Sequence, residues 1–188
     1  MAKATYRLAL GVAMTAALMS SDRVDASDQQ ESTNLAEAVD PTSARVRTDD
    51  PVLATLIRDA TDRSTTFRRL VEAITATDGV VYVVRGECPR PLRACLAFSM
   101  AVAGPNRILR VIVDDRKVGS EAIVSIAHEL QHALEVLSYR SVRTSGEMFG
   151  VFQRIGTWQG HSFETLAAIK VGEAVRSELR DARGRQVR

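Results

Sequence analysis

Two histidines and a glutamate at residues 128–132 have the types and the spacing that metal-assisted hydrolysis needs. His128 and His132 are four positions apart, so on a helix both imidazoles project from one face and can bind one zinc ion. Zinc lowers the pKa of a bound water from about 15.7 towards 7. Glu129 lies beside the ion, where its carboxylate can take a proton from zinc-bound water and deliver it to a leaving amine. The pattern predicts a nucleophile for amide carbonyls at neutral pH.

The residues around this motif predict a largely buried helix from about Ser120 to Ser138. Apolar side chains recur there at helical spacing, at Ile123, Ile126, Ala127, Leu130, Ala133, Leu134 and Leu137. Imidazoles and a carboxylate on a buried helix need partners, because an unpaired polar group is costly away from water. A catalytic zinc ion meets that need. A metal-free polar cluster and a purely structural zinc ion are the alternatives.

A third zinc ligand must come from another segment, and the sequence offers three candidates. A final helix is expected from about Ser162, as its N-cap, to Arg180, with Glu164 near its start. The residues at helical spacing after Glu164 are alanines and valines, which places Glu164 on the inward face. Glu173 has charged and polar helical neighbours, which suit a surface ion pair. We therefore expect Glu164 to bind the metal, with Glu173 and His161 as alternatives.

The remaining pattern predicts an α+β domain that positions these groups. Helical periodicity from Pro51 to the Asp78-Gly79 turn indicates a backing helix. Three apolar or β-branched runs then predict a small antiparallel sheet, a meander of Val80–Val84, Leu92–Val102 and Ile108–Val113. The active-site helix, a short helix at Glu147–Ile155 and the glutamate-bearing C-terminal helix follow.

The first 26 residues predict export from the cytoplasm. Lys3 and Arg7 form a positive region, Leu8–Met19 an apolar run, and Val24-Asp25-Ala26 a cleavage site with small residues. The apolar run is shorter than the roughly 20 residues that a membrane-spanning helix needs. We therefore expect a signal peptide at residues 1–26, no stable membrane insertion after its removal, and a periplasmic or secreted protein.

Length and composition predict one folded domain behind this signal. The chain has 188 residues, 45% of them hydrophobic, and a formal net charge of +2. That charge gives no reason to expect a nucleic-acid partner. Residues 27–50 are polar and lack apolar periodicity, so we expect a flexible linker there and a domain over residues 51–188.

The two cysteines flank a short Pro-Arg-Pro segment. An exported protein meets an oxidising environment, so we favour a disulfide between Cys88 and Cys95 over two unpaired thiols. A metal role for them is not expected, because no further cysteine completes a four-ligand set.

The His-Glu-x-x-His helix with a glutamate downstream resembles the zincin metallopeptidases, and within them the gluzincins. The order of backing helix, small sheet, active-site helix and glutamate helix is also similar. The resemblance implies that His128, His132 and Glu164 bind Zn²⁺ and that Glu129 is the catalytic base. It further implies a protein or peptide substrate, paired in extended form with a strand from Leu92–Val102 or Ile108–Val113.

The sequence departs from that family at one position. The segment from Phe163 to Ala168 resembles a Glu-x-x-Ala-Asp segment of some bacterial gluzincins, but Ala168 stands where the aspartate would be. The carboxylate that would steady a ligand histidine must therefore come from elsewhere or is missing. This departure keeps a second interpretation open, a catalytically inactive zincin-like module that holds metal and binds a protein partner.

Hydrolysis of an amide also calls for a donor that stabilises the oxyanion. Tyr139, Arg140, Arg154 and His161 are the candidates, and the sequence does not rank them.

Overall fold

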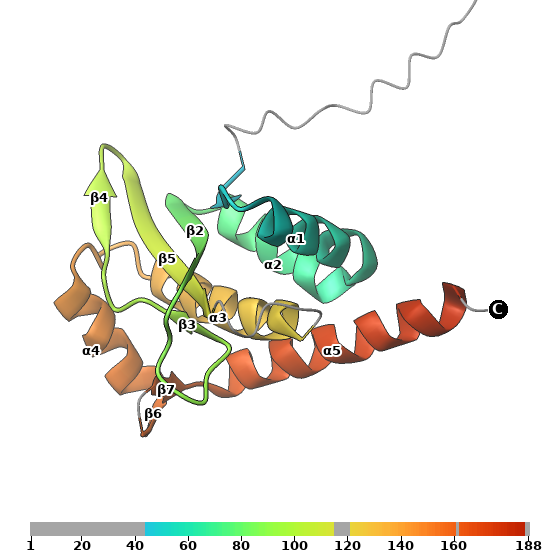
Figure 1. Ribbon diagram of the computed structural model, residues 1–188. Coiled ribbons are helices and arrows are strands. Elements are labelled where there is room, and N and C mark those ends of the chain that lie inside the picture. The colour runs from blue at the N-terminus through green and yellow to red at the C-terminus, as the bar shows by residue number, and fades with distance from the viewer. Residues whose placement is uncertain (1–43, 115–120, 161, 187–188) are drawn as a thin grey trace, which may run out of the picture. The chain divides into compact units, whose positions relative to one another are not determined.

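The computed structural model describes residues 44–114, 121–160 and 162–186, which belong to one compact unit. Helices and a mixed sheet make up an α+β fold in this part of the chain (Figure 1). The elements in chain order are β1 (Val46–Arg47), α1 (Pro51–Arg63), α2 (Thr65–Thr75), β2 (Gly79–Gly86), β3 (Ala94–Leu96), β4 (Ala101–Ala103), β5 (Asn106–Asp114), α3 (Ala122–Leu137), α4 (Ser145–Ile155), β6 (Thr157–Gln159), β7 (Ser162–Glu164) and α5 (Leu166–Gln186).

The backing helix is divided into α1 and α2 at Ser64. The Ser64 hydroxyl oxygen accepts a hydrogen bond from the Phe67 N–H at 3.0 Å, so this residue ends one helix and caps the next. Asp50 caps α1 in the same way, accepting from the Leu53 N–H at 2.9 Å. The buried side of α2 joins the core through Phe67, Leu70 and Ile74.

The main sheet is mixed, and the prediction of a wholly antiparallel meander is wrong. Its strand order is β1-β2-β5-β3, with β4 also paired to β5. β1 and β2 are parallel, as are β2 and β5, whereas β3 and β4 are antiparallel to β5. The chain leaves β2, passes through β3 and β4, and returns as β5, which lies between β2 on one side and β3 and β4 on the other. β2 therefore pairs with the strand of this sheet that comes last in the sequence, β5, and not with β3, the next strand along the chain.

β1 lies in the segment that the sequence predicts to be linker. Val46 pairs with Val81 of β2, and the Arg45 guanidinium donates to Asn106 Oδ1 at 2.6 Å. Residues 44–50 therefore belong to the folded domain. Residues 27–43, together with the predicted signal peptide at 1–26, lie outside the described residues.

α3 lies between the sheet and α5 (Figure 1). The predicted burial of this helix is confirmed, because ten of its residues are buried, among them Ile126, Leu130 and Val136. They pack against Val81 and Val83 of β2, inward-facing residues of β5, and α2. The predicted short helix is also present as α4, capped by a reciprocal pair of hydrogen bonds between Thr144 and Glu147.

A fully buried arginine fixes the C-terminal end of α3. Arg107 of β5 pairs with Asp78 and donates to the backbone carbonyl oxygens of Leu137 at 2.7 Å and Tyr139 at 2.8 Å. The last carbonyls of a helix lack partners within the helix, so the guanidinium satisfies them and ties the helix to the sheet.

Cys88 and Cys95 form a disulfide. The bridge closes the loop between β2 and β3, which includes Pro89 and Leu92 and carries the chain to the edge of the sheet that faces α3. This settles the pairing that the sequence leaves open.

Candidate metal centre

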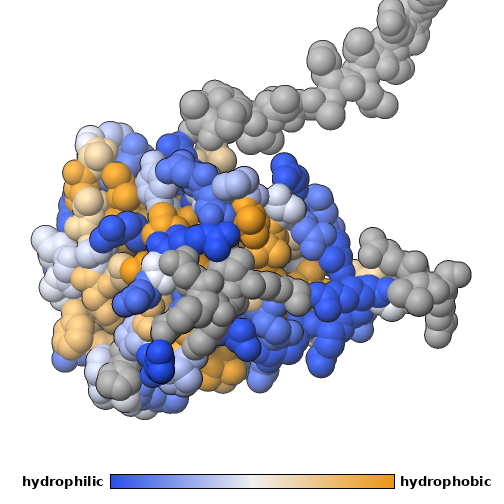
Figure 2. Space-filling model, in the orientation of Figure 1, coloured by the Kyte–Doolittle hydropathy of each residue, from blue (hydrophilic) through white to orange (hydrophobic). Residues whose placement is uncertain are grey.

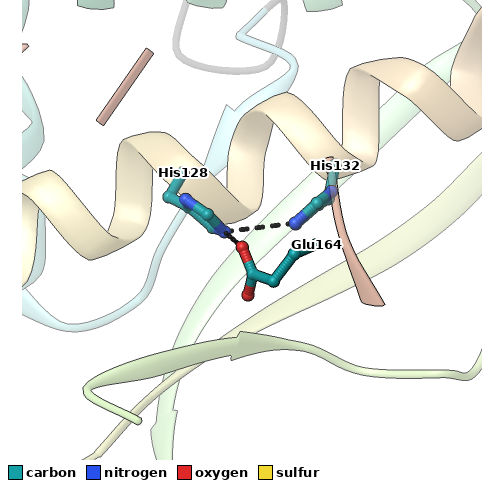
Figure 3. A group of neighbouring side chains, drawn as sticks. All are labelled: His128, His132 and Glu164. Carbon is teal, nitrogen blue, oxygen red and sulfur yellow. Dashed lines mark hydrogen bonds and ion pairs between the residues drawn. The ribbon is translucent and has the colours of Figure 1, made fainter. Parts of the chain in front are cut away.

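α3 presents both histidines of the motif on one face (Figure 3). His132 is buried and His128 is half-buried, and their Nε2 atoms lie 3.2 Å apart. The fourfold spacing places the rings one helical turn from each other, as the sequence predicts.

Glu164 completes a cluster with these histidines. Its Oε2 lies 3.1 Å from His128 Nε2, and the ligand atoms of the three residues all lie within 4.8 Å of one another. The residue stands on β7, paired with Thr157 of β6, and not in the final helix as predicted. α5 starts two residues later, with Thr165 accepting from the Ala168 N–H at 3.1 Å as its cap. The helical-face argument therefore placed Glu164 in the wrong element, although the structure brings it to the histidines.

The geometry and the chemistry of this donor set suit a zinc ion. Atoms bound tetrahedrally at about 2.1 Å from zinc are about 3.4 Å apart. The two short separations here, 3.2 Å between the histidines and 3.1 Å from His128 to Glu164, are close to that value. Two imidazole nitrogens and one carboxylate oxygen also form a known set for catalytic zinc sites, which keep a fourth position open for water.

A second carboxylate, that of Glu135, contacts the ring nitrogen of His132 that faces away from His128. Glu135 Oε2 lies 3.0 Å from His132 Nδ1, and a carboxylate can only accept, so Nδ1 carries a proton. In the neutral ring the lone pair is then on Nε2, the nitrogen that faces His128. Thr165 donates its hydroxyl to Glu135 Oε1 at 2.6 Å. Thr165 follows Glu164 directly. The two hydrogen bonds of Glu135 therefore connect the segments that carry two of the three candidate ligands, His132 and Glu164.

The two histidines respond differently to their surroundings. Burial lowers the pKa of His128, and the neighbouring His132 lowers it further. Burial also opposes protonation of His132, but the hydrogen bond to Glu135 and the surrounding carboxylates outweigh it and raise the pKa of that ring. The site thus concentrates negative charge around His132, which favours a cation between the rings.

Glu129 lies between two hollows at this centre. Its Oε2 accepts a hydrogen bond from the Leu96 N–H of β3 at 2.8 Å. Burial raises the pKa of Glu129 to about 7, against the lowering effects of His132 and the Leu96 N–H. A carboxylate with such a pKa can both accept and release a proton near neutral pH.

The two hollows differ in chemistry. The first, of about 250 Å³, has mainly apolar walls that include Leu96, Phe98, Phe152 and Phe163, and Glu129 and His132 also line it. The second, of about 300 Å³, is lined by His128, Glu129 and Glu164 together with the charged side chains of Arg93, Glu173 and Arg176. An extended chain lying across the centre would therefore meet an apolar wall on one side and charged groups on the other.

The other predicted candidates lie elsewhere. Glu173 is exposed on α5 and lines the second hollow, but it is not among the converging ligand atoms of the described residues. Tyr139, Arg140 and Arg154 are exposed, and none of them lines either hollow; the Arg154 guanidinium lies 6.0 Å from the centroid of the Tyr139 ring. His161 lies outside the described residues.

Sequence reasoning missed Glu135, Arg93 and the aromatic wall. The sequence spacing could have pointed to Glu135, because a residue three positions after His132 lies on nearly the same helix face. Phe98 and Phe163 come from separate segments that only the fold brings together, and Arg93 carries no motif.

Comparison with protein-family models, curated proteins and solved structures finds no match for this chain. Among the described residues, no helix combines the length and apolar character needed to cross a membrane.

Proposed function

We propose that the chain is an exported zinc-dependent peptidase with a zincin-like arrangement, in which His128, His132 and Glu164 hold the metal. The observation that carries the proposal is the convergence of these three ligand atoms beside Glu129, between two hollows. A zinc ion in such a site supplies Lewis acidity, which makes water a nucleophile at neutral pH and polarises a carbonyl. The Cys88–Cys95 disulfide supports export, since such bonds persist in oxidising compartments.

Glu129 is the general base in this proposal. The Leu96 N–H holds one of its carboxylate oxygens, which fixes the side chain between the hollows. With a pKa raised to about 7, the carboxylate takes a proton from the attacking water and returns it to the leaving amine. Glu135 and Thr165 keep the ring of His132 in one tautomer and one orientation throughout.

β3 is the strand that can accept an extended substrate. It lies at the edge of the sheet, and Leu96 turns its N–H away from β5 towards Glu129. β5, the alternative from the sequence, pairs with β2 on one side and with β3 and β4 on the other, so its backbone is already occupied. Arg93 precedes β3 and lines the second hollow, which makes it a better candidate for the oxyanion donor than Tyr139, Arg140 or Arg154.

The proposal is tested with Glu129→Gln, an isosteric change that removes the base. We expect cleavage of an unfolded, fluorescently labelled protein to fall by a factor of about 10² or more, with zinc content unchanged. Glu173→Gln, which removes a carboxylate at the rim of the second hollow, is the matched control and should keep most of the activity. Zinc-loaded wild type that cleaves no unfolded protein would instead favour the inactive metal-binding module.

A further inference from the structure

Four of the five phenylalanines and the single tryptophan of the chain gather at one end of the metal centre. They come from the loop between β3 and β4, from α4 and from the β6–β7 hairpin: Phe98, Phe149, Phe152, Trp158 and Phe163. Neighbouring ring centroids within this group are 4.8 to 6.2 Å apart. We call these five residues the aromatic surface.

Burial in the protein core explains the positions of only two of these five side chains. Phe152 and Phe163 are buried, at 2% and 7% exposure, and form its base. Trp158 is 54% exposed, and Phe98 and Phe149 are each 42% exposed. Over α4 the molecular surface is accordingly apolar (Figure 2). Large rings that remain half in water next to one another are typical of binding surfaces, because they offer much apolar area at a small cost in side-chain entropy.

The aromatic surface is continuous with the reacting groups. Phe98, Phe152 and Phe163 line the first hollow, in which Glu129 and His132 also stand. The Phe152 ring lies 5.4 Å from the ring of His132. A side chain seated in this hollow therefore has its backbone close to the catalytic carboxylate, so the natural occupant is the molecule that reacts there.

A third hollow, which we call the outer hollow, is also lined by residues of the aromatic surface. It is lined by Phe149, Trp158 and Phe163, with Gln153 and Gly156, so Phe163 is common to the first and the outer hollow. None of the described residues that line the outer hollow is charged. The first hollow carries the carboxylates of Glu87 and Glu129, which disfavour an acidic side chain.

We propose that the aromatic surface binds the substrate and selects extended peptide segments rich in large apolar side chains. One such side chain occupies the first hollow beside Glu129, and another packs on Trp158 and Phe149. The inference rests on the proposed peptidase function for its choice of occupant, but the contact surface itself can be measured without any cleavage.

Trp158 provides that measurement, because it is the only tryptophan in the chain. The zinc-loaded Glu129→Gln protein is titrated with a ten-residue peptide of serine, alanine and lysine that carries two phenylalanines two positions apart. Side chains at that spacing share one face of an extended chain. We expect a blue shift of the tryptophan emission with the phenylalanine peptide, and none when serine replaces both phenylalanines.

Two variants complete the test. Phe149→Ala should weaken binding of the phenylalanine peptide at least fivefold. Val52→Ala, which trims a side chain 47% exposed on α1, should leave it unchanged. Equal binding of the two peptides would overturn the inference. A blue shift of the tryptophan emission that depends on protein concentration and not on added peptide would also overturn the inference, because the occupant would then be a second copy of the chain.

Cleavage of the two peptides by the wild type distinguishes a failure of this inference from a failure of the proposed function. Wild type that cleaves both peptides equally well would overturn the substrate preference and leave the peptidase intact. Wild type that binds the phenylalanine peptide in the first hollow but never cleaves it would contradict the peptidase and support the binding surface.

Discussion

Glu135 Oε2 accepts a hydrogen bond from the Nδ1–H of His132, with 3.0 Å between the two heavy atoms, and stands three residues further along the same helix. Ala168 stands where the resemblance places an aspartate, and Glu135 of α3 is a carboxylate that contacts a histidine of the candidate site. Its other oxygen is bound by Thr165, next to Glu164, so the positions of two candidate ligands depend on one side chain.

Replacement of Glu135 should therefore weaken metal binding without unfolding the protein. Partners of this kind typically account for a factor of 10 to 100 in metal affinity. We expect Glu135→Gln to raise the zinc dissociation constant by about that factor, measured by competition with a chromogenic chelator. A constant equal to that of wild type would show that the hydrogen bond does not position His132.

Removal of the metal should leave the fold in place. The core is built from residues such as Phe67, Ile74, Val111 and Ile126, all fully buried, and it includes none of the candidate ligands. We expect dialysis against a chelator to abolish cleavage, to keep the far-ultraviolet circular dichroism spectrum, and to lower the melting temperature modestly by mass action. Loss of the helical spectrum would instead identify a structural ion.

Arg107 should be among the most important residues for stability. It is fully buried, and its loss would leave Asp78 without its partner and several helix-end carbonyls without donors. We expect Arg107→Met to lower the free energy of unfolding by about 3–5 kcal/mol in urea titrations. Arg110→Met, at an exposed position on the same strand, should change it by less than about 0.5 kcal/mol. Equal effects of the two changes would contradict this role.

The Asp78–Arg107 pair also predicts a pH dependence of stability. The hydrogen bond from Arg107 lowers the pKa of Asp78 below its ordinary value of 3.8, despite partial burial. A lowered pKa means that the stabilisation is fully present above the ordinary value and is lost as the pH falls through the folded-state value. The stability difference between wild type and Asp78→Asn should therefore shrink between neutral pH and about pH 2. A constant difference would contradict the ion pair.

The local patterns of the sequence predicted the helices well. The apolar period of α3, the end of the helical segment before β2 and the presence of α4 could be predicted, because they depend on residues close together in the chain. The division of α1 from α2 was not anticipated, although Ser64 is a strong N-cap residue.

The sheet was harder to predict because strand pairing depends on distant residues. The run Val80–Val84 is continuously apolar, and such runs are typical of parallel strands buried on both faces. That signal pointed to the observed parallel pairing with β5, against the usual preference for hairpins between neighbouring strands. β1, with two residues, carries no pattern that a sequence could reveal.

The candidate site likewise combines residues that local spacing predicts with residues that only the fold brings together. The spacing of His128, Glu129 and His132 is local, and it led directly to the residues that the structure brings together. Glu164 was chosen by an argument about a helix, but it lies on the short strand β7 that precedes α5. Glu135 was overlooked although it lies on α3 together with both histidines, and the residues of the aromatic surface are brought together only by the fold.

The zinc content of the purified, processed protein tests the central claim most directly. We expect elemental analysis to find about one zinc per chain in wild type and in Glu173→Gln, and much less in Glu164→Gln after dialysis against a weak chelator. A wild-type protein that takes up no zinc when the ion is offered in excess would contradict the account. So would a Glu164→Gln protein that retains zinc as tightly as wild type.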